Sequence, residues 1–361
     1  METVWQPSRG EARQGDEYVF AGDIGGTNTG FALVRLAGGK LFTDGKFLFQ
    51  TRAVPSLAQA AREAIGEIRR KLPGIVMRKA CLCVAGPVAE NRCVMTNVPW
   101  TISGEDLGAE LGMRVKIIND FTALGYALPL LDLHNPEEIT PLCRGGGAPS
   151  PSGKIRAVVG AGTGLGIGCL AETGGGFTAI ASEGGHTDFA ATDPLSRELR
   201  AWVEKRIGSI PETELFVSGQ GLINLFGFFR EKAEGTGRLS EAFSEIAALP
   251  DGEKPARIAA RAARDPGCAD IMRLFVRMYA RVAYNAAVTF LPTAGLYLAG
   301  GIVGKTEAWF LEDGAFMKGF LAAYRPKIRD LLKSIPVYII RDYGASLRGA
   351  GNAARCLMGG E

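Results

Sequence analysis

Short apolar runs separated by glycine-rich turns fill the first fifty residues. Apolar residues dominate 18–21, 31–36 and 41–50, and the turn-forming pair Asp44-Gly45 falls inside the third run. Runs of this length that are bounded by glycine are typical of β-strands. The pattern therefore predicts a meander of three strands, the third of which bends at Asp44-Gly45.

Helical spacing of apolar residues begins after Pro55-Ser56 and ends before Pro73-Gly74, two residues that break helices. Ser103 opens a second helix, in which Asp106 can complete a capping pair. Strands that alternate with helices indicate a mixed α/β fold. The strands predicted around these helices are 79–85, 92–96 and 115–118.

Longer helical patterns dominate the second half of the chain. The stretch 282–304 carries no charge and is long enough to span a membrane, but Asn285, Pro292 and four glycines interrupt it. A buried helix followed by a strand explains it better, so no membrane segment is expected. The elements predicted here are helices at 193–207, 221–233, 240–249, 269–290, 306–323 and 346–357, and strands at 296–299 and 337–340.

A Gly-Thr turn between two apolar runs occurs twice, at 26–30 and at 162–166. The two copies indicate two related domains, with chance similarity as the alternative because few positions match. A chain of 361 residues has room for about two domains. Glycine, at 49 of 361 residues, is nearly twice as frequent as the usual ~7%. The fold therefore needs tight turns or a close approach of backbone to a ligand.

Charge and cysteine content exclude several classes of protein. The net charge is only +3 and the basic residues are scattered, which disfavours a nucleic-acid-binding face. Seven cysteines without a Cys-x-x-Cys pair indicate reduced thiols in a cytosolic protein. Only two histidines, His134 and His186, are present, which disfavours a histidine-based metal site. Residues 1–17 lack the apolar run of a signal peptide and are expected to form a disordered lead, and 144–153 a loop.

The first glycine turn directly follows a strand and is a candidate phosphate-binding loop. Gly25 and Gly26 let backbone N–H groups approach an anion, and Thr27 and Asn28 add side-chain donors. Asp23 can hold Mg²⁺ beside those phosphates, directly or through water. For one such loop, an ordinary hairpin with Asx turns is the alternative.

The second glycine turn strengthens the interpretation of the first as a phosphate-binding loop. Gly160, Gly162, Thr163 and Gly164 repeat the Gly-Thr core between two apolar strands. Two such turns can face each other across a cleft and hold a polyphosphate from both sides.

Polar residues at two further places suit a hydroxylated substrate. Asn119 and Asp120 end a predicted strand, where Asp120 can take a proton from a hydroxyl that attacks a phosphate. The alternative for Asp120 is the N-cap of the next helix. Glu183 and His186 flank two glycines and suit a vicinal diol, with a structural histidine as the alternative.

Three other segments match the residue spacing of functional motifs. Residues 299–306 fit the P-loop spacing with alanine at the first glycine, which makes Lys305 a rival phosphate ligand. A P-loop normally follows an early strand, which weakens this alternative. Residues 349–354 fit Gly-x-Gly-x-x-Ala, but the chain ends too soon for a ribose ligand, so helix packing explains them better. Cys81 and Cys83 are expected to fill the core.

Six segments of this chain, in this order and spacing, resemble those of the bacterial ATP-dependent glucokinases. The resemblance covers about residues 19–357 and implies the actin-like ATPase (ribonuclease H-like) fold, with two α/β domains and the active site in the cleft between them. It implies one domain of 1–130 plus 346–361 and a second of 131–345. The six segments are 23–28, 85–100, 118–123, 160–166, 183–186 and 298–303.

The resemblance also assigns roles to residues. It makes Asp120 the catalytic base and the two glycine turns the phosphate loops of ATP, and it implies an adenosine loop at Gly300 and Gly301. Glu214 is matched by its spacing before Ser218-Gly219. The residues implied to hold the sugar hydroxyls are Asn119, Asp120, Glu183, His186 and Glu214.

The implied reaction is transfer of the γ-phosphoryl group of MgATP to the 6-hydroxyl of D-glucose, by a cytoplasmic homodimer. Two alternatives are a P-loop NTPase that uses Lys305 and a sugar-sensing protein without catalysis. The chain departs from the family at Gly30, where arginine is usual, and in the additions at 1–17 and 144–153.

Overall fold

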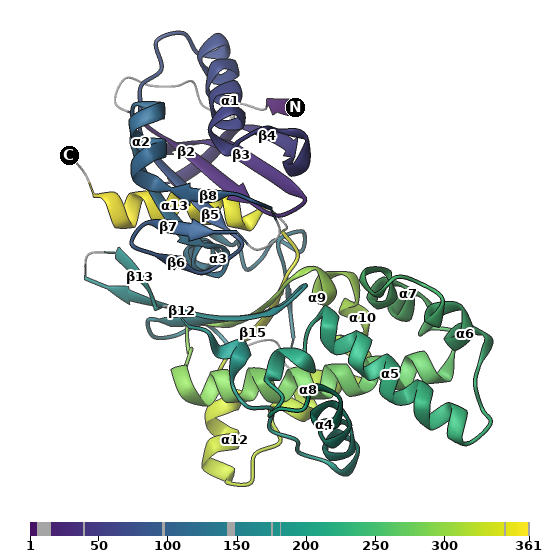
Figure 1. Ribbon diagram of the computed structural model, residues 1–361. Coiled ribbons are helices and arrows are strands. Elements are labelled where there is room, and N and C mark those ends of the chain that lie inside the picture. The colour runs from purple at the N-terminus through teal and green to yellow at the C-terminus, as the bar shows by residue number, and fades with distance from the viewer. Residues whose placement is uncertain are drawn as a thin grey trace. The chain divides into compact units, whose positions relative to one another are not determined.

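The computed structural model describes residues 1–5, 16–38, 40–95, 98–142, 149–174, 176–180, 182–342 and 344–359 (Figure 1). The chain divides into two compact units. Unit 1 comprises Met1–Asp132, Glu172–Ile180 and Asp342–Glu361, and unit 2 comprises Leu133–Ala171 and Ala181–Arg341. The domain boundaries that the resemblance implies stay a prediction.

Unit 1 is built on a six-stranded sheet of order β1-β4-β3-β2-β5-β9. Strands β2, β3 and β4 form the predicted antiparallel meander, and β5 and β9 continue the sheet parallel to β2. The bend in β4 is confirmed, because the pairing shifts between Leu33 and Val34 and leaves Asp44 as an extra residue. The strands are β1 (Glu2–Trp5), β2 (Glu17–Ile24), β3 (Asn28–Ala37), β4 (Lys40–Gln50), β5 (Met77–Val84) and β9 (Arg114–Asn119).

The disordered lead expected over 1–17 is wrong for the residues that the structure describes there. Residues 2–5 form β1, which pairs antiparallel with β4 at the edge of the sheet. The Trp5 ring covers Gly45, where an added Cβ would lie 2.6 Å from the ring, and it also packs near Phe47. Burial of this aromatic ring accounts for the ordered strand. Residues 6–15 lie outside the described part.

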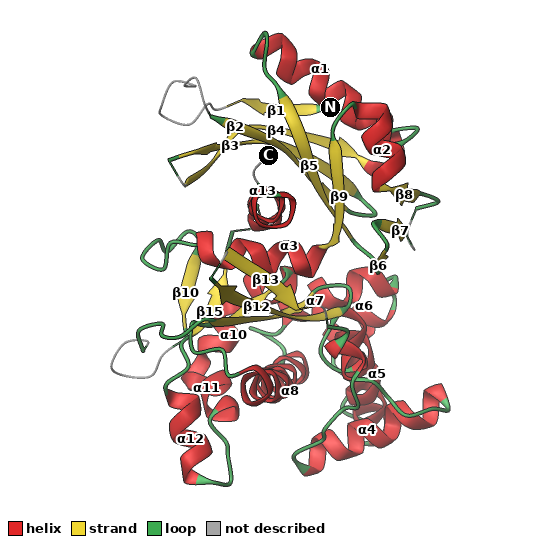
Figure 2. Ribbon diagram, turned by 90° about the vertical axis from the view of Figure 1, so that its left-hand side faces the viewer, coloured by secondary structure: helices red, strands yellow, loops and turns green. Residues whose placement is uncertain are grey.

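Helices cover both faces of this sheet (Figure 2). Helices α1 (Leu57–Lys71) and α2 (Gly104–Leu111) lie on one face, and α3 (Asp120–Ala127) and α13 (Ala345–Met358) lie on the other. Both predicted helix starts are confirmed, since Ser56 accepts from Gln59 N and Ser103 from Asp106 N. Within the described residues, no return hydrogen bond from the Asp106 side chain completes the predicted capping pair. A small sheet of β6 (Val88–Ala89), β7 (Arg92–Val94) and β8 (Thr101–Ser103) completes the unit.

Glycines allow α13 to approach α3 and the sheet closely. A Cβ at Gly349 would overlap the carbonyl oxygen of Ala123, and a Cβ at Gly351 would lie 2.8 Å from a Val34 methyl carbon. The buried Asn352 donates to the carbonyl of Tyr126 over 2.8 Å. The segment 349–354 therefore serves helix packing, which confirms the interpretation made from the sequence.

A second six-stranded sheet has the order β10-β15-β14-β11-β12-β13, in which β11, β14 and β15 run parallel. Unit 2 is built on this sheet except for β13 and the end of β12, which are assigned to unit 1. The strands predicted at 296–299 and 337–340 are confirmed, and each begins and ends at the predicted residue. These strands are β10 (Ile139–Pro141), β11 (Ile155–Ala161), β12 (Leu165–Thr173), β13 (Gly176–Ile180), β14 (Leu296–Ala299) and β15 (Val337–Ile340).

The largest part of the unit 2 core surrounds α8 (Pro266–Phe290), which packs against β11 (Figure 1). The buried hydroxyl of Tyr279 on α8 donates to the carbonyl of Val159 over 2.7 Å. The uncharged stretch 282–304 divides between the end of α8 and β14, as predicted. Among the described residues, no helix is long and apolar enough to cross a membrane.

One predicted helix of unit 2 is wrong, and three helices were not predicted. In place of one helix over 306–323, the chain forms two short α-helices, α10 and α11. A 3₁₀ turn separates them, and in it Asp313 (φ 48°) and Gly314 (φ 62°) are left-handed. Left-handed residues cannot continue an α-helix. The three that were not predicted are α7, α9 and α12. The other helices of the unit are α4 (Pro194–Ile207), α5 (Gly219–Gly235), α6 (Glu241–Ala247), α7 (Lys254–Arg261), α9 (Gly301–Lys305), α10 (Glu307–Leu311), α11 (Ala315–Phe320) and α12 (Pro326–Lys333).

Cysteines in the described part of the chain are free thiols, and five of these six are buried. Cys81 and Cys83 lie side by side in the core of unit 1, as expected, and burial raises the pKa of both. Cys143 and the segment 143–148 lie outside the described residues, so the predicted loop over 144–153 is described only from residue 149 on.

Gly349→Ala should destabilise the protein, because the new Cβ overlaps a backbone carbonyl that cannot move without separating α13 from α3. We expect the free energy of unfolding to fall by about 2 kcal/mol. Gly66→Ala on the exposed face of α1 is the matched control, since nothing lies within 4 Å of its Cβ. Helix propensity should make that variant about 1 kcal/mol more stable. Urea unfolding followed by circular dichroism measures both, and equal effects would contradict the packing described here.

Candidate active site

Three segments of unit 1 meet at one edge of its sheet. Strands β2, β5 and β9 are adjacent and parallel, with Ile24 beside Val84 and Val84 beside Asn119. The residues that follow these strands therefore emerge together at the carboxyl edge, where open α/β sheets bind ligands. The first glycine turn and the Asn119-Asp120 pair, far apart in the sequence, share this edge.

The first glycine turn is held by backbone hydrogen bonds and by Thr51. Gly25 N donates to Asn28 O over 2.9 Å, and Thr51 Oγ1 donates to Gly25 O over 2.8 Å. Thr51 N also donates to Thr27 O over 2.9 Å. The side chains of Thr27 and Asn28 are exposed at the tip of the turn. A fixed turn with exposed donors can receive a phosphate group without reorganisation.

Asp23, at the end of β2, accepts a hydrogen bond from the hydroxyl of Ser346 at the start of α13. Gly30, directly opposite Asp23 across the β2–β3 pair, offers it no side chain. No ion pair to Asp23 is found among the described residues. Asp23 is partly buried, and its hydrogen-bond partner Ser346 is neutral and does not compensate a carboxylate with a positive charge. Mg²⁺ is usually bound by one or two carboxylates together with substrate phosphates. The donor set therefore fits Mg²⁺.

Asn119 fixes the junction between β9 and α3. Its Oδ1 accepts from Phe121 N over 2.8 Å, and its Nδ2 donates to Gly86 O over 3.1 Å. Asn119 is therefore the N-cap of α3, the role that had been the alternative for Asp120. Asp120 is the first residue of the helix, and its Oδ1 also accepts from Phe121 N, over 2.9 Å.

The pKa of Asp120 is raised from 3.8 to about 6. Burial is the largest cause, because removal from water disfavours the carboxylate form. The hydrogen bond from Phe121 N lowers this pKa, and the nearby negative charge of Asp23 raises it. A carboxyl group with a pKa near 6 is a stronger base than an ordinary aspartate and is still ionised at neutral pH.

In unit 2, two glycine segments meet at the carboxyl ends of β11 and β14, where Gly160 pairs with Ala299. Gly162 N donates to Gly164 O over 2.8 Å, which closes the second turn, and the side chain of Thr163 is exposed. Gly300 has φ 96°, and a Cβ there would overlap the carbonyl of Ala161. Only glycine allows the loop after β14 to lie this close to the second turn.

The segment 299–306 does not have the conformation of a P-loop. The chain becomes helical at Gly301, directly after β14, and α9 continues to Lys305. In a P-loop these residues wrap around the phosphates before the helix begins. Thr306 donates its hydroxyl to Ile302 O within the same turn, over 2.7 Å. The P-loop alternative with Lys305 is therefore wrong.

Glu183 precedes a short 3₁₀ turn of unit 2, Gly184–His186, and His186 is the last residue of that turn. His186 Nδ1 lies 2.7 Å from Glu212 Oε2, and His186 Nε2 lies 4.0 Å from Glu183 Oε2. The hydrogen bond to Glu212 raises the pKa of His186, and the charges of Glu212, Glu214 and Glu183 act in the same direction. The side chains of Glu183 and His186 are exposed and therefore accessible to a substrate.

Glu214 connects this acidic cluster with the second glycine turn. Its Oε2 accepts from Leu165 N over 2.7 Å, and it occupies the space that a Cβ at Gly164 would need. Its Oε1 has no hydrogen-bond partner within the described ranges. One oxygen is thus fixed by the turn, and the other is available to a ligand.

Two residues of these sites were not found by sequence reasoning. Glu212, the partner of His186, belongs to no motif and could have been noticed only by its position two residues before Glu214. Ser346, the partner of Asp23, lies near the other end of the chain. No local sequence signal identifies either contact, because both depend on the tertiary structure.

Comparison with known proteins gives consistent matches over nearly the whole chain. The family model described as Glucokinase matches residues 20–357. A glucokinase of Synechocystis sp. is 35% identical over 356 residues, covering 92% of this chain and 97% of that relative. A glucokinase of Pectobacterium atrosepticum is 32% identical, covering 95% of this chain and 98% of the relative.

Solved structures agree in fold. A glucokinase from an Antarctic psychrotroph has a TM-score of 0.78 at 25% identity and covers 94% of this chain and 98% of its own. A ROK family glucokinase from Streptomyces griseus, solved in complex with glucose and AMPPNP, has a TM-score of 0.56 at 20% identity, covering 94% of this chain and 99% of that chain. The chain has the actin-like ATPase fold, and with the family model and its relatives this shows that it belongs to the glucokinase family.

Proposed function

We propose that this protein transfers the γ-phosphoryl group of MgATP to the 6-hydroxyl of D-glucose, giving glucose 6-phosphate and ADP. The observation that carries the proposal is the partly buried Asp120 at the carboxyl edge of the unit 1 sheet, with a pKa of about 6. Membership in the glucokinase family supports the choice of glucose and ATP. We further propose a cytosolic homodimer, as the family resemblance implies.

Asp120 is proposed as the general base. Its carboxylate accepts the proton of the 6-hydroxyl as that oxygen attacks the γ-phosphorus, and the bond between the γ-phosphorus and the β–γ bridging oxygen of ATP breaks. Phosphoryl transfer passes through a loose, highly charged transition state, so positioning and electrostatic stabilisation contribute most of the catalysis. Asn119 supports this role because its two hydrogen bonds fix the backbone on which Asp120 stands.

The sugar hydroxyls are assigned to Asn119 and Asp120 of unit 1 and to Glu183, His186 and Glu214 of unit 2. Exposed acceptors at Glu183 and a ring donor at His186 suit a vicinal diol. Glu212 keeps Nδ1 of His186 engaged, which leaves Nε2 to face the sugar. The unpartnered Oε1 of Glu214 is a further acceptor for a hydroxyl.

The nucleotide is assigned to the glycine segments. Gly25, Gly26, Thr27 and Asn28 are proposed to bind phosphates from unit 1, with Asp23 as the Mg²⁺ ligand, directly or through water. Mg²⁺, when bound, neutralises charge on the phosphates as the terminal one departs. The residues assigned in unit 2 are Gly160, Gly162, Thr163 and Gly164 for the phosphates and Gly300 and Gly301 for the adenosine.

Glucose should be required for ADP release from MgATP, and Asp120→Asn should remove that release. We expect the turnover number of the variant to fall by at least about 10²-fold, the usual contribution of a general base, while glucose still binds. Asp106→Asn, an exposed aspartate of α2, is the matched control and should retain full activity. A coupled ADP assay and calorimetric glucose titration measure both effects.

Near-normal turnover by Asp120→Asn would remove Asp120 from the role of base. ADP release that does not depend on glucose would instead indicate an NTPase. Glucose binding without any ADP release would favour a sugar-sensing protein.

The pH dependence of kcat/KM for glucose should follow the raised pKa of Asp120. The base acts as the carboxylate, so activity should fall as the pH drops below about 6, approaching a tenfold loss per pH unit. Above pH 7 this group should no longer limit the rate. Initial rates between pH 5 and 8 at constant ionic strength test this. A profile that stays flat down to about pH 5 would contradict a pKa of about 6 for Asp120, and with it the burial that raises this pKa.

A further inference from the structure

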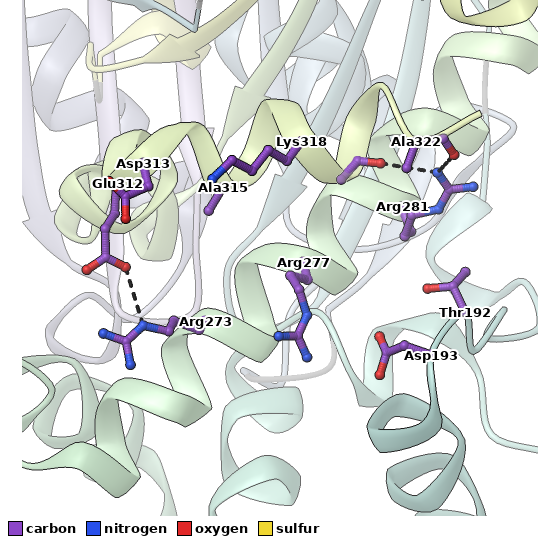
Figure 3. Close-up of a pocket in the computed structure, with 11 residues that line it drawn as sticks. Thr192, Asp193, Arg273, Arg277, Arg281, Glu312, Asp313, Ala315, Lys318 and Ala322 are labelled. Carbon is purple, nitrogen blue, oxygen red and sulfur yellow. Dashed lines mark hydrogen bonds and ion pairs between the residues drawn. The ribbon is translucent and has the colours of Figure 1, made fainter. Parts of the chain in front are cut away.

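A concave site lies in unit 2 between α8, α11 and the segment that leads into α4. It is a cavity of about 520 Å³ that is partly open to solvent (Figure 3). Cavities of this size accommodate small metabolites. No residue assigned above to glucose or ATP lines it.

Basic side chains from two helices line this cavity. Arg273, Arg277 and Arg281 stand four residues apart on α8 and therefore share one face of the helix. Lys318 extends from α11 on the opposite wall (Figure 3). Four cationic groups thus surround a space the size of a small ligand.

Two of these cations are held by the protein itself. Arg281 donates to the carbonyls of Gly319 and Ala322 over 3.2 and 2.9 Å, and its guanidinium lies 3.9 Å from the centre of the Tyr284 ring. Arg273 forms an ion pair with Glu312 over 3.5 Å. These contacts fix the geometry of the cavity wall and compensate part of its charge.

Arg277 and Lys318 differ from Arg273 and Arg281 in having no partner within the described part of the chain. Neither side chain forms a hydrogen bond or an ion pair within the described part of the chain, and both are exposed. Both line the cavity, where their charges are available to an anion. Arginine and lysine together are the usual partners of a phosphate group.

Acceptors and a hydroxyl line the same cavity. Asp193 caps α4 by accepting from Ser196 N over 2.9 Å, and Thr192 precedes it. Glu312 and Asp313 lie at the other end (Figure 3). These carboxylates would repel a bare polyanion but would accept hydrogen bonds from hydroxyl groups. A ligand that carries one phosphate and several hydroxyls satisfies both parts of the lining.

We propose that this cavity binds a sugar phosphate, with the phosphate on Arg277 and Lys318 and the sugar hydroxyls toward Asp193 and Thr192. The site is separate from the residues assigned to catalysis, so its occupancy is a binding function in its own right. The proposal does not rest on the proposed reaction, because binding can be measured without turnover.

Calorimetric titration with glucose 6-phosphate, inorganic phosphate and glucose tests the proposal. During the titrations with glucose 6-phosphate and with inorganic phosphate, the protein solution contains saturating glucose. This glucose occupies the sugar site of the proposed reaction, so that the titrants are measured at the cavity. We expect glucose 6-phosphate to bind the wild-type chain at least tenfold more tightly than inorganic phosphate. The double variant Arg277→Gln, Lys318→Gln should weaken that binding at least tenfold, because each charge contributes charge-assisted hydrogen bonds.

Lys333→Gln, an exposed lysine of α12 outside the cavity, is the matched control and should bind as the wild type does. The double variant replaces two side chains that have no partners within the described part of the chain, so its thermal unfolding should be unchanged, which would confirm that the fold is intact. Unaltered glucose 6-phosphate binding in the double variant would overturn the proposal, even if the enzyme turns over normally. Equal affinity for inorganic phosphate would overturn the assignment of a sugar, and no binding by the wild type would overturn the site.

Discussion

The hydrogen bonds that join β2, β5 and β9 bring three separate parts of the sequence to one edge of a sheet. Their parallel register places Ile24, Val84 and Asn119 side by side, so the first glycine turn and Asp120 emerge together. The close approach of α13, possible because Gly349 carries no side chain, adds the Ser346 hydroxyl to Asp23. The arrangement of chemical groups in unit 1 follows from this pairing and packing.

The same packing explains why Asp120 differs from a surface aspartate. Burial at the junction of β9 and α3 disfavours its charged form, and the charge of Asp23 adds to that effect. A carboxyl group whose pKa is raised in the folded protein lowers the free energy of unfolding as the pH rises from about 3.8 to about 6. Above that range the folded protein holds the carboxylate partly away from water, and the full loss of stability remains. The protein retains a destabilising group at the place where a base of pKa about 6 is useful, which is typical of functional sites.

Elements and residues with a local signal could be predicted from the sequence. The strands at 296–299 and 337–340, the caps Ser56 and Ser103, and the bend at Asp44 all follow from apolar runs, capping residues or turn pairs. Strand β1 could not be predicted, because it depends on Trp5 packing over Gly45. The prediction of one helix over 306–323 was wrong at Asp313, because the spacing of apolar residues does not indicate that this residue is left-handed. Glu212 and Ser346 were missed because their partners are set by the tertiary fold, and the roles assigned to the site residues stay a prediction.

The proposed reaction depends most on the raised pKa of Asp120 in the folded protein. Carbon-13 NMR of protein labelled at aspartate carboxyl carbons measures this directly, with Asp120→Asn identifying the signal. The account predicts a titration midpoint near pH 6 for Asp120. A midpoint close to 3.8, the ordinary value for aspartate, would contradict it, because Asp120 would then be an exposed carboxylate without the basicity that the proposed reaction uses.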